Sequence, residues 1–84
     1  MSRQHHYLKI WPEFYRAIER GEKTFEVRFN DRNFQKYDIL HLKEWVGEYT
    51  GREITAEVTY VLEDPKFCKE GFVTMSIAVR NIHN

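Results

Sequence analysis

The fold is decided by residues 7–29, YLKIWPEFYRAIERGEKTFEVRF, where a helical pattern stands between two strand patterns. Residues 7–11 alternate as a short strand, and Pro12 suits the first turn of a helix, where its missing N–H costs nothing. An apolar stripe with helical spacing follows, made of Trp11, Phe14, Tyr15 and Ile18. Gly21 is expected to end this helix in the left-handed conformation. A helix this short must pack on a sheet to be stable.

Further strands are predicted by alternation of side chains over residues 24–29, 39–45, 53–62 and 72–79. In the first of these, Phe25, Val27 and Phe29 are expected to face the core, with Glu26 and Arg28 on the other face. Gly47 and Gly51 frame a predicted hairpin loop.

Five strands and one early helix, without a repeated βαβ unit, predict an α+β fold, a mixed domain of small size. A curled sheet or partly closed barrel is favoured because closure removes exposed edges. No linker or repeat divides the chain, so residues 1–84 are predicted to form a single domain. The predicted core consists of Leu8, Ile10, Phe14, Ile18, Phe25, Val27, Leu40, Leu42, Val58, Tyr60, Met75 and Ile77.

The composition is that of an ordinary folded protein: 84 residues, 42% hydrophobic and 31% charged, with 13 basic and 13 acidic side chains. Residues 1–43 nevertheless carry nine basic and six acidic side chains, a difference of +3. A balanced total excludes the strongly basic class of nucleic-acid binders, which gain affinity by releasing counterions. An anion would have to bind in a local pocket of the first half, although chance also explains such an excess.

No apolar run approaches the ~20 residues of a membrane span, and the first ten residues lack an apolar signal core. A cytoplasmic protein without a membrane partner is therefore expected. The single cysteine, Cys68, excludes an intrachain disulfide and a cysteine-based zinc site. His5 and His6 are adjacent, so they cannot form a metal pair on one helix face. Neither a metal nor a cofactor is expected.

Residues 21–28, GEKTFEVR, hold the densest cluster of functional side chains. Glu26 and Arg28 project from the same strand face, and Lys23 stands just before the strand. Arginine offers a planar fork of donors to a phosphate or a base edge, and glutamate can accept from an exocyclic amine. The alternative is a solvated polar face with one surface ion pair, worth ~0–1 kcal/mol.

Two further side chains belong to this candidate ligand-binding site. Lys9 joins it if the first strand is a neighbour of residues 24–29. Trp45 lies on the face opposite Leu40 and Leu42, where it is either second-face core or a stacking platform for a base. Trp11 is expected in the core or on the rim of the cleft.

The spacing Gly21-x-Lys23-x-x-Glu26-x-Arg28 resembles the G-x-K-x-x-E-x-R signature of the ASCH domain, the activating signal cointegrator homology domain of the PUA-like superfamily. Residues 8–12, 38–40, 47–60 and 71–77 look like the small bacterial and phage branch of this group. The resemblance implies a PUA-like mixed β-barrel of five to six strands, with the short helix after the first strand. It also implies a ligand cleft beside the signature, with RNA or a nucleotide-like small ligand as partner.

The same superfamily implies an alternative, a small hydrolase acting on a modified nucleoside such as acetylcytidine. Those amidohydrolases use a lysine in the signature and a threonine in the slot of the signature glutamate. Here the lysine slot holds Lys23, but the threonine slot holds Glu26, and Thr24 is out of register. A binding module is therefore expected rather than an enzyme. A protein-interaction domain is a third possibility.

Overall fold

The computed structural model describes residues 3–84, and its elements follow the predicted order of strand, helix and four further strands. The elements are β1 (His5–Ile10), α1 (Pro12–Glu19), β2 (Phe25–Phe29), β3 (Ile39–Trp45), β4 (Tyr49–Leu62) and β5 (Phe72–His83). The last two strands are longer than predicted, and β4 begins before Gly51, so that only a tight turn separates it from β3.

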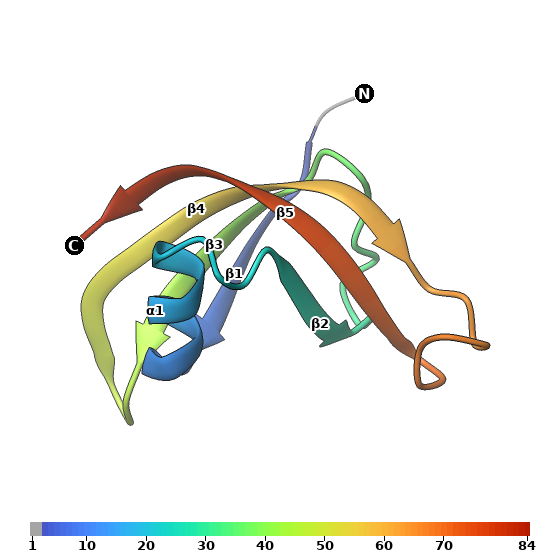
Figure 1. Ribbon diagram of the computed structural model, residues 1–84, viewed down its shortest axis with the longest axis horizontal. Helices are drawn as coiled ribbons and strands as arrows, with labels where there is room; N and C mark the ends of the chain where they lie inside the picture. The colour runs from blue at the N-terminus through green and yellow to red at the C-terminus, as the bar shows by residue number, and fades with distance from the viewer. Residues whose placement is uncertain (1–2) are drawn as a thin grey trace.

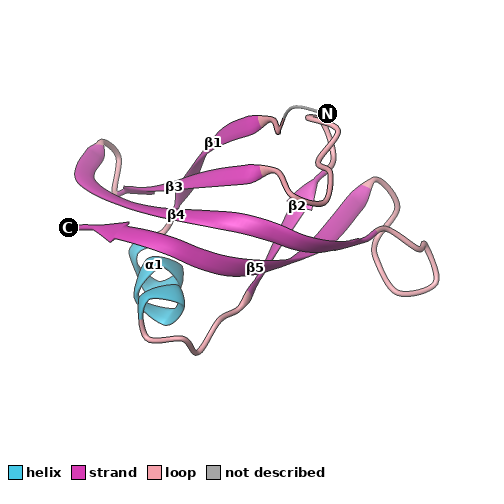
Figure 2. Cartoon of the chain, turned by 90° about the horizontal axis from the view of Figure 1, so that it is seen from above, coloured by secondary structure: helices cyan, strands magenta, loops and turns pink. Residues whose placement is uncertain are grey.

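The strands form one mixed sheet in the order β1-β3-β4-β5-β2. β1 runs parallel to β3, and the other pairs are antiparallel. This sheet is a half-barrel: it arches over α1, and its two edge strands, β1 and β2, approach each other below the arch (Figure 1). Seen from above, α1 lies on one side of the sheet and the loop between β4 and β5 extends beyond it (Figure 2). The predicted α+β class and curled sheet are confirmed.

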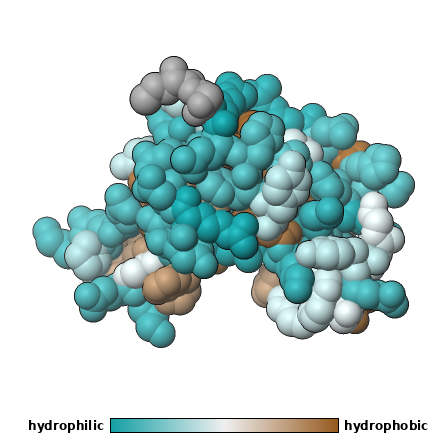
Figure 3. Space-filling view, turned by 180° about the vertical axis from the view of Figure 1, so that it is seen from behind, coloured by the Kyte–Doolittle hydropathy of each residue, from teal (hydrophilic) through white to brown (hydrophobic). Residues whose placement is uncertain are grey.

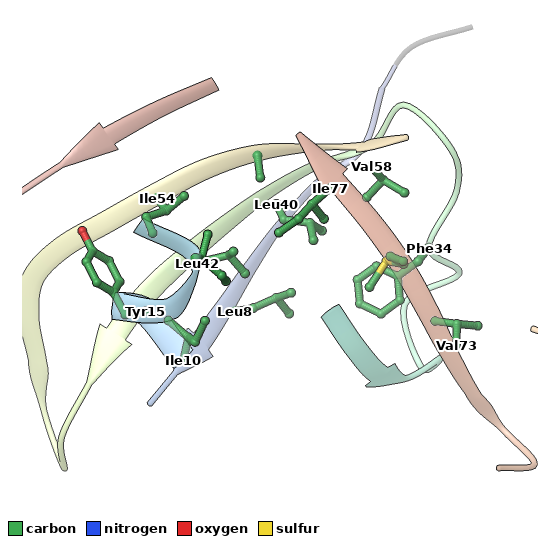
Figure 4. Packing of buried hydrophobic residues seen from close by; sticks show 13 residues of the cluster. Leu8, Ile10, Tyr15, Phe34, Leu40, Leu42, Ile54, Val58, Val73 and Ile77 are labelled. Atoms are coloured by element: carbon green, nitrogen blue, oxygen red, sulfur yellow. The ribbon is translucent and has the colours of Figure 1, made fainter. Parts of the chain in front are cut away.

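The core fills the concave side of the arch, where α1 contributes Tyr15 and Ile18 (Figure 4). The predicted core residues that are buried there are Leu8, Ile10, Ile18, Leu40, Leu42, Val58, Met75 and Ile77. Phe34 was not predicted, because it lies in a polar loop, yet only 2% of it is exposed. Its ring meets the buried His6 edge-on.

The predicted orientation of β2 is wrong. Phe25 is 44% exposed and Val27 is also exposed, whereas Glu26 is buried. Directly paired residues of neighbouring strands share a face, and Glu26 is paired with the fully buried Met75. The alternation of β2 was predicted correctly, but the two faces were assigned the wrong way round. The polar side chains can face inward because they form hydrogen bonds and ion pairs with other groups there.

Two other predicted core residues are exposed. Tyr60 is 61% exposed because β4 carries an extra residue, Thr59, between the pairs Val58–Ile77 and Tyr60–Ser76. Such a bulge reverses the alternation, so that Val61 packs against the core instead. Phe14 lies at the edge of the helix stripe and is half-exposed.

Hydrophilic residues cover most of the face shown in Figure 3, and the largest apolar patches lie near its lower edge, with smaller ones scattered over the rest of the face. Among residues 3–84, no helix combines the length and the apolar character that a membrane span requires. The only helix described there, α1, has eight residues.

Candidate ligand cleft

The end of α1 brings the first functional side chain into place. Gly21 has a φ of +77°, which confirms its predicted left-handed conformation. Its N–H donates to the carbonyl of Ile18 at 3.0 Å, and the N–H of Glu22 donates to the carbonyl of Ala17 at 2.9 Å. These bonds form a Schellman motif, which closes the helix. The backbone position of Lys23 is therefore fixed between the helix end and β2, which begins two residues later.

A cleft of about 360 Å³ lies between the end of β1, the start of α1 and β2. Its size is within the ~300–1,000 Å³ typical of small-molecule sites. The cleft is lined by Lys9, Ile10, Trp11, Phe14, Lys23, Glu26, Val27 and Arg28. It thus brings together four of the five predicted site residues.

The floor of the cleft is an ion cluster centred on Glu26, which is 4% exposed. One carboxylate oxygen, Oε1, accepts a hydrogen bond from Lys23 Nζ. The other oxygen, Oε2, accepts from Arg28 Nε at 3.0 Å. A buried carboxylate is tolerated only when its charge is compensated, and here two cations compensate it. The predicted contact from Glu26 to a ligand amine stays a prediction, whereas its bonds to the two cations orient both of them.

Arg28 also joins the two edges of the half-barrel. Its Nη2 donates to the main-chain carbonyl of Lys9 in β1 at 2.9 Å. Arg32 forms a second link of this kind, from Nη1 to the carbonyl of Tyr7 at 3.0 Å. Residues two apart in a strand present their carbonyls to the same side, so both arginines clasp one edge of β1. Lys23 Nζ also donates to the main-chain carbonyl of Phe25 at 2.6 Å, so it keeps one further N–H donor, and Arg28 likewise keeps N–H groups beyond its two bonds. Both side chains line the cleft.

The cleft is positively charged although the chain as a whole is neutral. Lys23 and Arg28 supply two positive charges against one negative charge from Glu26, which leaves a net charge of +1. Lys9 on the rim adds another positive charge. Because the positive charges outnumber the negative one, the cleft attracts anions locally although the chain has no net charge.

Trp45, the fifth predicted site residue, lies outside this cleft but beside it. A second hollow of about 140 Å³ is lined by Lys9, Ile10, Trp11 and Trp45. The two indole rings stand edge to face, with centroids 5.7 Å apart, and Lys9 Nζ lies 4.6 Å from the centre of the Trp45 ring. Trp11 is mostly exposed, so it belongs to the cleft rim and not to the core.

Sequence reasoning missed a cluster of imidazoles on the outer face of the sheet. His5 Nδ1 lies 2.9 Å from His41 Nε2, and His41 Nδ1 lies 3.0 Å from Glu53 Oε2. The parallel pairing of β1 with β3 brings these residues together across 36 positions of sequence, which no local pattern reveals. Within residues 3–84, no group of three or more His, Cys, Asp or Glu side chains is arranged to hold a metal.

Fold and cleft together define a class: a small domain with a mixed-sheet half-barrel and a basic cleft at the opening between its edge strands. Residues 5–77 match the family model described as "Domain of unknown function (DUF3850)", and the chain belongs to this family. It is also similar to the "Uncharacterized 12.9 kDa protein in GpA 3'region" of Escherichia phage P2, with 37% identity over 59 residues. That match covers 69% of this chain and 54% of the relative, so the chain spans about half the length of the protein it matches.

Proposed function

We propose that the cleft binds RNA or a nucleotide-like ligand, with Arg28 and Lys23 as the anion-binding groups. The observation that carries this proposal is the burial of Glu26 between these two cations. A surface ion pair does not need a buried carboxylate, whereas a preorganised anion site benefits from one that fixes its cations in place. The guanidinium then presents its remaining donors to a phosphate or a base edge.

The resemblance to the ASCH domain is part of this proposal. Its support is that the signature residues act as one unit: Gly21 ends the helix, and Lys23, Glu26 and Arg28 form the ion cluster. On this view the half-barrel is a PUA-like barrel and the cleft is its ligand site.

We propose binding without hydrolysis of acetylcytidine by a threonine. No Ser, Thr, Cys or Tyr is among the eight residues that line the cleft. Thr24 is exposed directly before β2, and its carbonyl accepts from the N–H of Ile77 at 3.0 Å. This cleft therefore offers a nucleoside amide no hydroxyl or thiol nucleophile from its lining.

Calorimetric titration with mononucleotides and short RNA strands tests the proposal, using Arg28→Lys and Lys23→Ala. Losing the arginine fork should weaken binding by ~1–3 kcal/mol, about 5- to 150-fold, because an ammonium cannot replace two parallel donors. Arg32→Lys is the matched control, since Arg32 makes the same kind of bond to β1 but does not line the cleft.

For Lys23→Ala the control is Lys66→Ala, at an exposed lysine in the loop between β4 and β5. Equal affinities of Arg28→Lys and Arg32→Lys would contradict the assignment of the cleft.

Incubation with acetylcytidine is the second experiment, and it tests the hydrolase alternative. If the unmodified chain releases acetate and Lys23→Ala does not, the protein is a hydrolase and the proposal of a binding module is wrong.

A further inference from the structure

The outer face of the sheet carries a strip of alternating lysine and aromatic side chains that begins at the rim of the cleft. Odd-numbered residues of β1 and β3 face outward, since Leu8 and Ile10 in β1 and Leu40 and Leu42 in β3 are buried. The lysine–aromatic strip consists of Tyr7, Lys9, Lys43, Trp45 and Tyr49. Strand pairing sets its rows, with Lys9 beside Lys43 and Trp45 beside Tyr49.

Each lysine of the strip lies over ring faces. Lys9 Nζ is 4.6 Å from the centre of the Trp45 ring and 6.0 Å from that of Tyr49. Lys43 Nζ is 5.1 Å from the Tyr49 ring and 6.0 Å from the Tyr7 ring. Within residues 3–84 neither lysine forms a salt bridge. Both ammonium groups are thus free of carboxylate partners in that part of the chain.

The strip is continuous with the cleft. Its hollow at Trp45 shares Lys9, Ile10 and Trp11 with the main cleft. At about 140 Å³ this hollow is smaller than a self-sufficient ligand pocket of ~300–1,000 Å³, so it is better described as an extension. Tyr7, Trp11 and Tyr49 are each more than half exposed beside it. One face of the Tyr7 ring stacks on His41, with ring centroids 4.4 Å apart, so only its other face remains for a base.

We infer that the ligand is a single-stranded nucleic acid of several nucleotides, which occupies the cleft and continues over the lysine–aromatic strip. This inference rests on the proposed function of the cleft. Aromatic faces stack on bases of any sequence, and lysines between them pair with the phosphates that link those bases. A duplex hides its base faces and offers nothing to the rings. The neutral total charge fits a short strand with few phosphate contacts better than a long duplex.

The experiment compares affinities for a mononucleotide, a tetranucleotide and a duplex, in the unmodified chain and in Trp45→Ala and Tyr49→Ala. The tetranucleotide should bind more tightly than the mononucleotide, and the duplex should bind weakly. Each alanine variant should lose tetranucleotide affinity about 5- to 150-fold more than mononucleotide affinity, since one stacked base is removed. Trp45→Phe should retain most of the length dependence because it keeps a ring.

Phe67→Ala is the matched control, because Phe67 is a highly exposed aromatic in the loop between β4 and β5, outside the strip. If the mononucleotide and the tetranucleotide bind equally well and both depend on Arg28, the inference that the ligand extends over the strip is wrong, while the proposed function of the cleft stands. If tetranucleotide binding depends on Trp45 but not on Arg28, the strip binds nucleic acid and the assignment of the cleft as a ligand site is wrong. Preference for the duplex, or absence of any binding, would overturn the inference.

Discussion

Arg28 in β2 donates to the carbonyl of Lys9 in β1, across the opening between the two edge strands of the half-barrel. The same guanidinium holds the buried Glu26, so one side chain closes the fold and equips the cleft. This double role affects how mutants must be measured, because a lower melting temperature is expected even if Arg28 also contacts a ligand. Affinity has to be determined well below the melting temperature, on folded protein.

Arg28→Ala should destabilise the protein by ~1–3 kcal/mol, because hydrogen bonds to charged groups contribute about that much. Arg32→Ala should cost less, since Arg32 is more exposed and the carboxylate of its ion pair, on Asp31, is 3.9 Å away and exposed. Urea melts of the two variants measure the difference. A larger loss of stability in Arg32→Ala would mean that the half-barrel is held closed by the bond from Arg32 to the Tyr7 carbonyl, and not by the bond from Arg28 to the Lys9 carbonyl.

Phe34→Ala should cost ~3–5 kcal/mol, the usual effect of truncating a buried phenylalanine. Phe25→Ala should cost about 1 kcal/mol or less, because 44% of Phe25 is already exposed in the folded state. The two variants delete the same atoms, so each is the control for the other in thermal or urea melts. Equal losses would place Phe25 in the core, as the sequence pattern had predicted.

Gly21→Ala should destabilise the protein by ~1–2 kcal/mol, because a residue with a Cβ is strained at a φ of +77°. Nothing lies within 4 Å of the position a Cβ would occupy, so the cost is purely conformational. Gly21→Asn should retain more stability, since asparagine adopts this conformation more readily. If the two variants melt alike, the helix end does not depend on the left-handed residue.

Acid should weaken the protein partly through Glu57, which bonds to Arg80 and lies 3.1 Å from Arg3. The hydrogen bond from Arg80 holds the pKa of the Glu57 carboxyl below its ordinary value of 4.5, against the opposing effect of burial. A folded-state pKa below the unfolded one adds stability that is present above the unfolded pKa and lost as the pH falls through the folded pKa.

Glu57→Gln should therefore be less stable than the unmodified chain at neutral pH, and its melting temperature should fall less steeply below about pH 4.5. Glu63→Gln, at an exposed loop position, is the control and should keep the full acid dependence. If the melting temperatures of Glu57→Gln and the unmodified chain depend on pH in the same way, Glu57 does not contribute to the acid sensitivity of the protein.

The features that depend on neighbours along the chain could be predicted from the amino-acid sequence. The helix after β1, its end at Gly21 and the alternation of β3 are local consequences of spacing and of backbone conformation. Lys23, Glu26 and Arg28 are also close in sequence, so their proximity at a helix–strand junction could be predicted. Lys9 joined them because the first strand does lie beside the cleft.

Which face of β2 points inward depends on contacts that form only in the folded protein. That choice depends on the Lys9 carbonyl, 19 residues away, which helps to satisfy Arg28, and on pairing of Glu26 with Met75. Sequence periodicity gives the alternation of a strand but not its sign, because polar groups can face inward where distant partners bond to them. The bulge at Thr59 and the burial of Phe34 likewise depend on chain segments that meet only in the folded state.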